Sequence, residues 1–256
     1  MNFHLIRNYG CLLLKFIEKN KLPYIIGTPE GDKLATFDAV FLQSMKSGNS
    51  SWVYPLILVL CAVFGYIIGS LNFAVIISKI FYKDDVRLHG SGNAGATNML
   101  RTYGKKAGIA TFVCDALKGA VSVLVSMLLM GQGGAYIAGL FCILGHIFPV
   151  FYKFRGGKGV VVAAITVLCL EPLVFLFLVL LFVFIVYWSR FISLGSIICA
   201  FFFPLLHNAF SQNKGFLSVT VSVLIAAIVI VMHHSNIKRL MNRTENKLSF
   251  SRKEKK

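Results

Sequence analysis

Long apolar runs separated by short polar loops set the pattern of this chain. Residues 53–80 are apolar over more than the ~20 residues that a helix needs to cross a bilayer, and Trp52 and Tyr54 are placed as an interfacial belt. Further apolar runs lie at 107–130, 135–150, 160–170, 172–187, 192–210 and 216–232. The pattern predicts an all-α polytopic membrane protein with about seven transmembrane helices.

The stretch 160–187 admits two interpretations, because only Glu171 and Pro172 interrupt it. A proline disfavours the helical conformation at the residue before it, so we expect a break and two short spans. A helix over 160–170 is only ~16 Å long, and the sequence leaves open whether it crosses completely.

The charge distribution predicts an orientation for these spans. With 57% hydrophobic and 14% charged residues, the chain is not a soluble domain. Its 26 Lys and Arg residues outnumber 10 Asp and Glu. Seven spans place the loops at 84–106 and 153–158, Arg190 and the tail from Lys238 on one side, which the positive-inside rule makes cytoplasmic. We therefore expect the polar motif loops on the cytoplasmic face and the lipid bilayer, not nucleic acid, as the partner.

Three regions follow from this pattern: an extension at 1–52, a membrane-integral domain at 53–236 and a basic cytoplasmic tail at 237–256. The apolar patch of the extension is too short to span a bilayer, so we expect an interfacial or disordered segment. Its six basic residues oppose the predicted orientation, but long tails obey the rule weakly. A chain that starts at Met45 is predicted to insert and function normally.

A glycine-rich basic turn, Arg155-Gly-Gly-Lys-Gly159, interrupts two apolar runs. Because it leads directly into the run from Val160, its backbone N–H groups can converge at a helix N-terminus, where the dipole favours a phosphate. Arg155 and Lys158 would add full charges. An ordinary basic loop at the membrane boundary would have the same sequence.

A second polar loop follows the first span. Gly90, Gly92 and Gly95 free its backbone, and neutral hydrogen-bonding groups and a cation follow in Ser91, Asn93, Thr97, Asn98 and Arg101. A flexible turn explains the glycines, whereas the clustered polar side chains indicate a loop that wraps a polar ligand.

Two charges inside an apolar run are further candidates. Asp115 and Lys118 lie in the second predicted span, and intramembrane charges are often functional. Their spacing places both on one helix face, so a local ion pair is the competing explanation. His146, on the last turn of the third span, either packs in the interior or serves the glycine-rich turn beside it.

Several motifs in order give the chain a family resemblance. They are Gly69-Ser70 with Asn72-Phe73, Gly90-Ser-Gly-Asn-Ala-Gly-Ala-Thr-Asn98 through Arg101, Asp115 to Gly119, Gly145-His146 to Gly159, Arg190-Phe-Ile-Ser-Leu-Gly-Ser196, and Asn236-Ile-Lys-Arg-Leu240 with Glu245. This set resembles the bacterial acyl-phosphate-dependent glycerol-3-phosphate acyltransferases of phospholipid synthesis. The chain departs from the family where His233-His234 replaces His-Arg and where Arg243-Thr244-Glu245 replaces Gly-Thr-Glu.

The resemblance implies an enzyme of the bacterial cytoplasmic (inner) membrane whose site faces the cytoplasm. It would transfer a fatty acyl group from acyl phosphate to the 1-hydroxyl of sn-glycerol 3-phosphate, giving lysophosphatidate and phosphate. Neither acyl-CoA nor acyl carrier protein would be required, and we expect no cofactor and no metal ion.

The resemblance also implies roles for particular residues. The catalytic set comprises Lys158, Ser91, His233 and Asn236. The substrate-binding set comprises Asn93, Asn98, Arg101, Lys118, His146, Gly156, Gly157, Gly159, Ser193 and Glu245. No His-x4-Asp arrangement follows any histidine, so the general base stays open, and a phosphate oxygen of the donor could take the hydroxyl proton.

A transporter for a small organic anion is the competing class, because intramembrane charges and a basic pocket would suit one. Alternating access requires a site near the membrane midplane and paired broken helices. Here the polar motifs lie at one boundary and no internal repeat is visible, which favours the enzyme.

Overall fold

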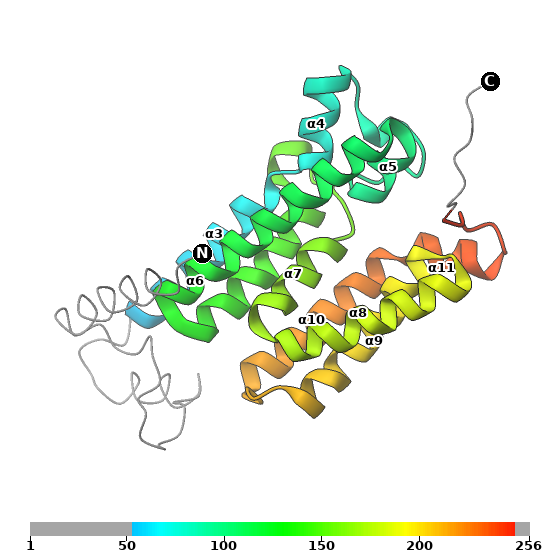
Figure 1. Ribbon diagram of the computed structural model, residues 1–256. Coiled ribbons are helices and arrows are strands. Elements are labelled where there is room, and N and C mark those ends of the chain that lie inside the picture. Colours follow the sequence, from blue (N-terminus) through cyan, green and yellow to red (C-terminus); the bar gives the residue numbers. More distant parts are fainter. Residues whose placement is uncertain (1–52, 249–256) are drawn as a thin grey trace, which may run out of the picture.

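The computed structural model describes residues 53–248, and every regular element in that range is a helix. Figure 1 shows the helices as a bundle of rods whose ends gather at two opposite ends of the molecule. In chain order the elements are α3 (Val53–Ser70), α4 (Phe73–Tyr82), η1 (Val86–Leu88), α5 (Ala96–Tyr103), α6 (Lys105–Ile147), η2 (Val150–Tyr152), α7 (Val160–Leu170), α8 (Pro172–Ser189), α9 (Ile192–Phe210), α10 (Phe216–Met232) and α11 (His234–Met241). The predicted all-α membrane fold is confirmed, and the predictions for residues 1–52 lie outside the described residues.

Helix α6 is a hairpin of two antiparallel arms. Met130 and Gly131 leave the helical conformation, with φ of −141° and 62°. Across the turn, the Ser122 hydroxyl donates to the Ala138 carbonyl at 3.3 Å, and the Lys118 ammonium lies 2.9 Å from Nδ1 of His146. The predicted helix break near residue 131 is therefore confirmed.

Helices α3 and α4 divide the first apolar run, which we had expected to be continuous over 53–80. The break falls at Leu71 and Asn72, and Asn72 caps α4 by accepting a hydrogen bond from the Val75 N–H at 3.2 Å. Close packing fixes the end of α3, because a Cβ at Gly69 would lie 2.2 Å from the Cys142 carbonyl oxygen. Such small residues let helix backbones approach in a membrane.

The predicted break at Glu171-Pro172 is present, and α7 runs from the glycine-rich turn at one end of the bundle to Glu171 at the other. There, Glu171 accepts hydrogen bonds from Tyr136 and from Ser211, the latter at 2.7 Å. Asn213 donates to Gln132 at 2.6 Å, so the turns after the first α6 arm and after α9 also meet at that end.

Judged by length and composition, the described helices include fewer candidate membrane spans than the seven that the sequence predicts. Four helical segments within 53–248 are long and apolar enough to cross a membrane, or up to five if the bent pair α10 and α11 counts as one. That count takes the α6 hairpin as a single segment and omits the short α7. Seven spans therefore remain a prediction.

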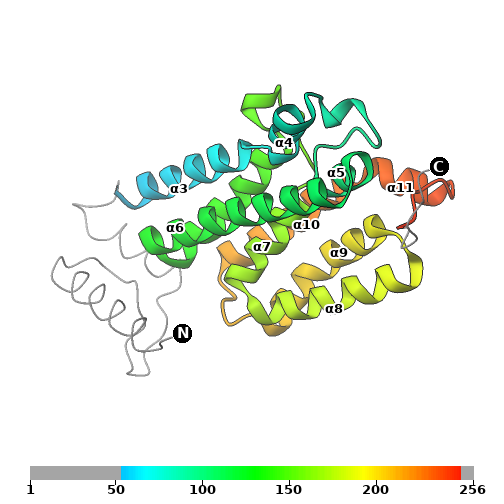
Figure 2. The ribbon, with the colours of Figure 1, turned by 45° about the horizontal axis from the view of Figure 1, so that its top comes forward.

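The core lies between the second arm of α6 and helices α7, α9 and α10 (Figure 2). Ile143, Val162, Phe203 and Val221 are buried there. Helix α8 instead exposes large apolar side chains such as Leu180 and Phe184, as a lipid-facing helix does. This arrangement leaves the polar loops at one end free to build a site.

Candidate functional site

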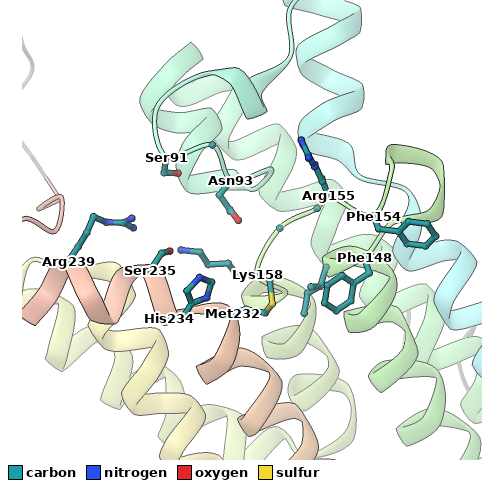
Figure 3. A pocket seen from close by; sticks show the side chains of 14 residues that line it. Ser91, Asn93, Phe148, Phe154, Arg155, Lys158, Met232, His234, Ser235 and Arg239 are labelled. Carbon is teal, nitrogen blue, oxygen red and sulfur yellow. The ribbon is translucent and has the colours of Figure 1, made fainter.

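Two adjoining cavities open at the end of the bundle where the polar loops meet. The smaller, of about 240 Å³, is shown in Figure 3, and the larger has about 520 Å³. Ser91, Asn93, Lys158 and Arg239 line both. The cavities therefore join around one hydroxyl, one amide and two cations, contributed by three segments far apart in the chain.

The glycine-rich turn packs tightly against the end of α6. The N–H groups of Gly156 and Gly157 donate to the carbonyls of Ile147 and His146 at 3.0 and 3.1 Å. A Cβ at Gly157 would lie 2.1 Å from Nε2 of His146 and 2.7 Å from the Ala94 carbonyl oxygen. These glycines permit close approach, and the expectation that their N–H groups are free for a phosphate is wrong.

The free N–H groups belong instead to the first turn of α7. Gly159 has a φ of 76° and precedes that helix, whose first N–H groups have no helical partner. Gly159, Val160 and Val161 line the larger cavity, so the positive end of the α7 dipole faces it.

Lys158 supplies a full charge beside this helix end. Its ammonium donates to Oδ1 of Asn236, which brings the turn into contact with α11. Burial, reinforced by the positive charge of Arg239, lowers the pKa of Lys158 to about 8. A bound anion would favour the protonated, positively charged form of this amine. Lys158 is therefore suited to binding phosphate.

Glu245 organises the opposite wall. Its Oε1 accepts from Ser193 at 2.9 Å and from Asn236 at 2.8 Å, and its Oε2 accepts from Arg239 at 2.7 Å. Burial opposes ionisation, but these donors together hold the pKa of Glu245 below its usual value. Glu245 therefore orients Asn236 and Arg239.

The loop before α5 is held by Asn98. Its amide donates to the carbonyls of Val86 and His89 at 3.1 and 3.0 Å, and its oxygen accepts from the Ser91 N–H at 3.0 Å. Asn98 thus uses its hydrogen bonds to place Ser91, whose hydroxyl lines both cavities. Arg101, one turn of helix later, also lines the larger cavity.

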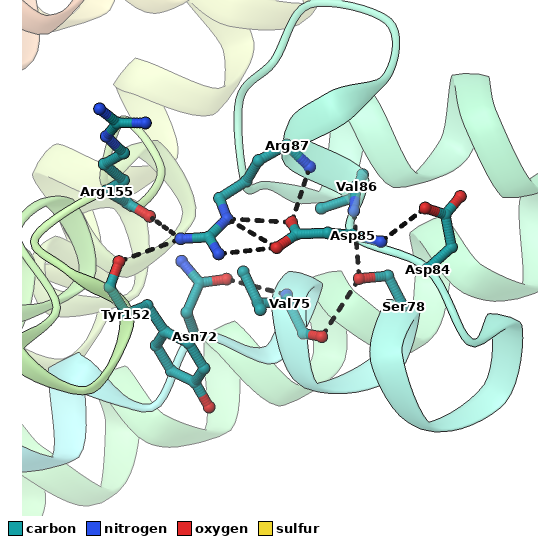
Figure 4. A network of polar contacts seen from close by, with 9 residues as sticks. All are labelled: Asn72, Val75, Ser78, Asp84, Asp85, Val86, Arg87, Tyr152 and Arg155. Atoms are coloured by element: carbon teal, nitrogen blue, oxygen red, sulfur yellow. Dashed lines mark hydrogen bonds and ion pairs between the residues drawn. The ribbon is translucent and has the colours of Figure 1, made fainter.

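Arg87 ties the same loop to the glycine-rich turn (Figure 4). Its guanidinium pairs with Asp85 at 2.7 Å and donates to the carbonyls of Tyr152 and Arg155 at 3.0 and 3.2 Å. One arginine therefore bridges the two segments that carry Ser91 and Lys158.

His233 lines the larger cavity, and its backbone contact determines which ring nitrogen carries the hydrogen. Its Nδ1 lies 2.7 Å from the Val229 carbonyl oxygen, which can only accept, so Nδ1 carries the hydrogen. In the neutral ring Nε2 is then an acceptor. His233 and Asn236 both line the cavity, and His234 faces the smaller one instead (Figure 3).

A buried polar cluster underlies the site. Lys118 pairs with Asp115 at 3.0 Å, as the ion-pair interpretation predicted, and Asp115 and His146 line the larger cavity. Lys118 lines neither cavity, and its side chain is only 2% exposed. Of the predicted site residues it alone lies away from both.

Beyond the polar mouth the larger cavity is apolar. Its walls come from α7, α8, α9 and α10 and include Val161, Ile165, Phe175, Leu178, Phe182, Ala200, Phe203 and Ile225. A flexible hydrocarbon chain could lie there with its polar head beside Lys158.

Of the Asp, Glu, Lys and Arg residues that line the larger cavity, two are absent from the predicted site, namely Asp115 and Arg239. Arg239 borders both cavities, and the signal for it was its place one turn after Asn236 in a motif of the resemblance. Asp115 was noted as an intramembrane charge, but only the fold shows that it reaches the cavity. Within 53–248, no group of three or more His, Cys, Asp or Glu side chains could hold a metal ion.

Comparison with known proteins identifies the family of this chain. Residues 59–243 match the family model described as glycerol-3-phosphate acyltransferase. The glycerol-3-phosphate acyltransferase of Thermoanaerobacter pseudethanolicus is 44% identical over 190 residues, 74% of this chain and 95% of that protein. One from Bacillus cereus is 39% identical over 193 residues, 75% of this chain and 96% of that protein.

A solved structure has the same fold. The crystal structure of PlsY (YgiH), an integral membrane glycerol 3-phosphate acyltransferase in its glycerol 3-phosphate form, is similar with a TM-score of 0.71 and 34% identity. The match covers 75% of this chain and 96% of that one. A lysophosphatidic acid form of the same enzyme matches with a TM-score of 0.68. The chain therefore belongs to the PlsY-type family of integral membrane glycerol-3-phosphate acyltransferases.

Proposed function

We propose that this glycerol-3-phosphate acyltransferase takes its acyl group from acyl phosphate, without acyl-CoA or acyl carrier protein. It would acylate the 1-hydroxyl of sn-glycerol 3-phosphate and yield lysophosphatidate and phosphate. The observation that carries this proposal is the larger cavity, which joins a cationic mouth at Lys158 to an apolar groove between α7 and α10. An acyl phosphate has the same two parts.

The charges at the mouth suit two phosphate-bearing reactants. Lys158, Arg101 and Arg239 all line the larger cavity, and the N-terminus of α7 adds its dipole. Two phosphates repel each other, so holding both within reacting distance needs several cations and N–H donors. Arg239 remains a third exposed although it pairs with Glu245, which leaves guanidinium N–H groups for a substrate.

The chemistry follows from these positions. The hydroxyl oxygen attacks the carbonyl carbon of acyl phosphate, the bond from that carbon to the phosphate oxygen breaks, and phosphate leaves with the electron pair. Nε2 of His233 accepts the hydrogen bond of the attacking hydroxyl, and a phosphate oxygen of the donor finally takes its proton. Lys158 stabilises the negative charge that develops.

The same proposal places the site at the cytoplasmic face of the bacterial inner membrane. The site end carries five basic residues from the segment 153–158 and from α11, namely Lys153, Arg155, Lys158, Lys238 and Arg239. The turns that meet at the other end carry Gln132, Asn213 and Lys214. The positive-inside rule favours the cytoplasm for the basic end.

Purified protein tests the donor. Radiolabelled glycerol 3-phosphate is incubated with palmitoyl phosphate, and in parallel with palmitoyl-CoA or palmitoylated acyl carrier protein. We expect label in lipid only with palmitoyl phosphate. Transfer from palmitoyl-CoA or the carrier protein at a comparable rate would refute the proposed donor. A parallel incubation without protein is the control for non-enzymatic acylation.

A further inference from the structure

We infer that Lys118 is a positioning residue that fixes His146 as a neutral Nε2–H donor, which points at a substrate phosphate in the larger cavity. This replaces the expectation that Lys118 binds substrate itself. The inference rests on the proposed function only for the identity of the anion.

The acceptors around Lys118 account for its hydrogens. Its ammonium donates to the carbonyl oxygens of Gly69 and Leu71 at 3.0 and 2.7 Å, and lies 2.9 Å from Nδ1 of His146. An ammonium has three N–H donors and no acceptor. Four acceptor atoms lie within 3.0 Å, but Asp115 Oδ1 makes no hydrogen bond, so the three donors go to Gly69, Leu71 and His146. Asp115, 3.0 Å away, neutralises the charge, and its Oδ1 has no hydrogen-bond partner.

This geometry determines the tautomer of His146. A hydrogen on Nδ1 would place two donors 2.9 Å apart, and the nearest carboxylate oxygen, on Asp115, is 3.6 Å from Nδ1, beyond hydrogen-bonding range. Nδ1 is therefore the acceptor. A neutral ring must then carry its hydrogen on Nε2, and a doubly protonated ring is excluded because both nitrogens would donate.

The remaining N–H lies where a ligand can use it. Nε2 sits directly under the glycine-rich turn, 2.1 Å from where a Cβ of Gly157 would be. Within the described residues the structure gives Nε2 no hydrogen-bond partner, and His146 lines the larger cavity together with Lys158 and Gly159. His146 thus joins the donors at the start of α7.

The cavity consequently holds two neutral histidines with opposite tautomers. His146 accepts at Nδ1 and donates at Nε2, whereas His233 donates at Nδ1 to Val229 and accepts at Nε2. The donor suits a phosphate oxygen and the acceptor suits a hydroxyl. Protonation of either ring would remove this difference.

The wild-type enzyme in detergent provides the first test. With ¹⁵N-labelled histidine, long-range ¹H–¹⁵N spectra distinguish the two tautomers, and a His146→Gln protein identifies the His146 signals. We expect hydrogen on Nε2 of His146 and a shift of that signal when inorganic phosphate is added. An Nδ1–H or doubly protonated His146, or no response to phosphate, would overturn the inference.

Variants test the part played by Lys118. In Lys118→Met, Nδ1 loses its donor, and we expect the ring to populate the Nδ1–H tautomer, whereas Lys118→Arg should keep Nε2–H. An unchanged tautomer in a folded Lys118→Met protein would refute the role. If that protein does not fold, the wild-type spectrum still decides the tautomer.

Kinetics test the donor itself. A Gln side chain can place an amide N–H where Nε2 lies, but an Asn side chain reaches only the position of Nδ1. We expect His146→Asn to raise KM for a phosphate substrate roughly tenfold or more, with His146→Gln closer to wild type. Equal effects of the two would contradict the proposal. Use of another acyl donor would refute the proposed function and leave the tautomer result standing.

Discussion

Replacing Lys158 by Ala tests the centre of the site, because this ammonium borders both cavities and contacts Asn236. One charge-assisted contact is worth ~1.5–3 kcal/mol, and at ~1.36 kcal/mol per tenfold its loss should lower kcat/KM roughly 10- to 150-fold. The loss will be larger if the ammonium also stabilises the transition state. Lys158→Arg keeps a charge but not the geometry, so we expect intermediate activity.

The pH dependence provides the sharper assay. Lys158 must be protonated to bind an anion, and its pKa is about 8, so kcat/KM should fall as the pH rises above that value. At pH 9, one unit higher, roughly 10% of the free enzyme stays charged, and kcat/KM should drop about tenfold from its plateau. Initial rates at low substrate measure this profile, with donor hydrolysis measured in parallel.

The Lys158→Ala protein should lack this alkaline decline, because it has no ammonium to titrate. A decline of the same midpoint and size in the variant would assign it to another group. A folded variant with kcat/KM within twofold of wild type would refute the assigned role altogether.

Three further predictions follow from the structure. Glu245→Gln should lower kcat/KM roughly tenfold or more, because the new amide N–H faces Arg239 and the charge pair is lost; kinetics within twofold of wild type would contradict the organising role. Gly157→Ala should destabilise the fold by about 1–3 kcal/mol, since its Cβ would lie 2.1 Å from His146. Gly119→Ala should not, because its Cβ would be 3.6 Å from the nearest neighbour, and thermal unfolding in detergent compares the two variants. In a background without native cysteines, an impermeant maleimide should label Gln132→Cys but not Thr102→Cys on intact cells, and the reverse pattern would overturn the orientation.

The apolar pattern predicts most of the helices because lipid leaves few alternatives. Backbone groups in hydrocarbon must bond within a helix, so long apolar runs become helices and polar interruptions become turns. This reasoning identified the breaks at Gly131 and at Glu171. It missed the break before α4, although Asn72 is a typical N-cap residue, because a single Asn in an apolar run can also hydrogen-bond to a neighbouring helix from within a span.

The site was harder to predict than the fold. The motifs predict that Ser91, Lys158 and Asn236 contribute to one site. They do not predict that Ser193 donates a hydrogen bond to Glu245, because the two residues lie 52 positions apart and no periodic pattern links them. The glycine-rich turn shows the same limit. Its sequence predicts N–H groups that converge on a phosphate, and only the path of the chain shows that carbonyls of α6 accept those of Gly156 and Gly157.

The short α7 explains how one site can serve a charged and an apolar substrate part. Its N-terminus lies beside Lys158 and Gly159, which we propose to bind phosphate, and its Ala163 and Val167 line the apolar part of the larger cavity. At its other end, Glu171 is held by Tyr136 and Ser211, which anchors the helix against α6 and the turn after α9. A helix fixed at both ends keeps its dipole and its apolar face aligned, so the polar head and the hydrocarbon chain of a donor would be oriented by one rigid element.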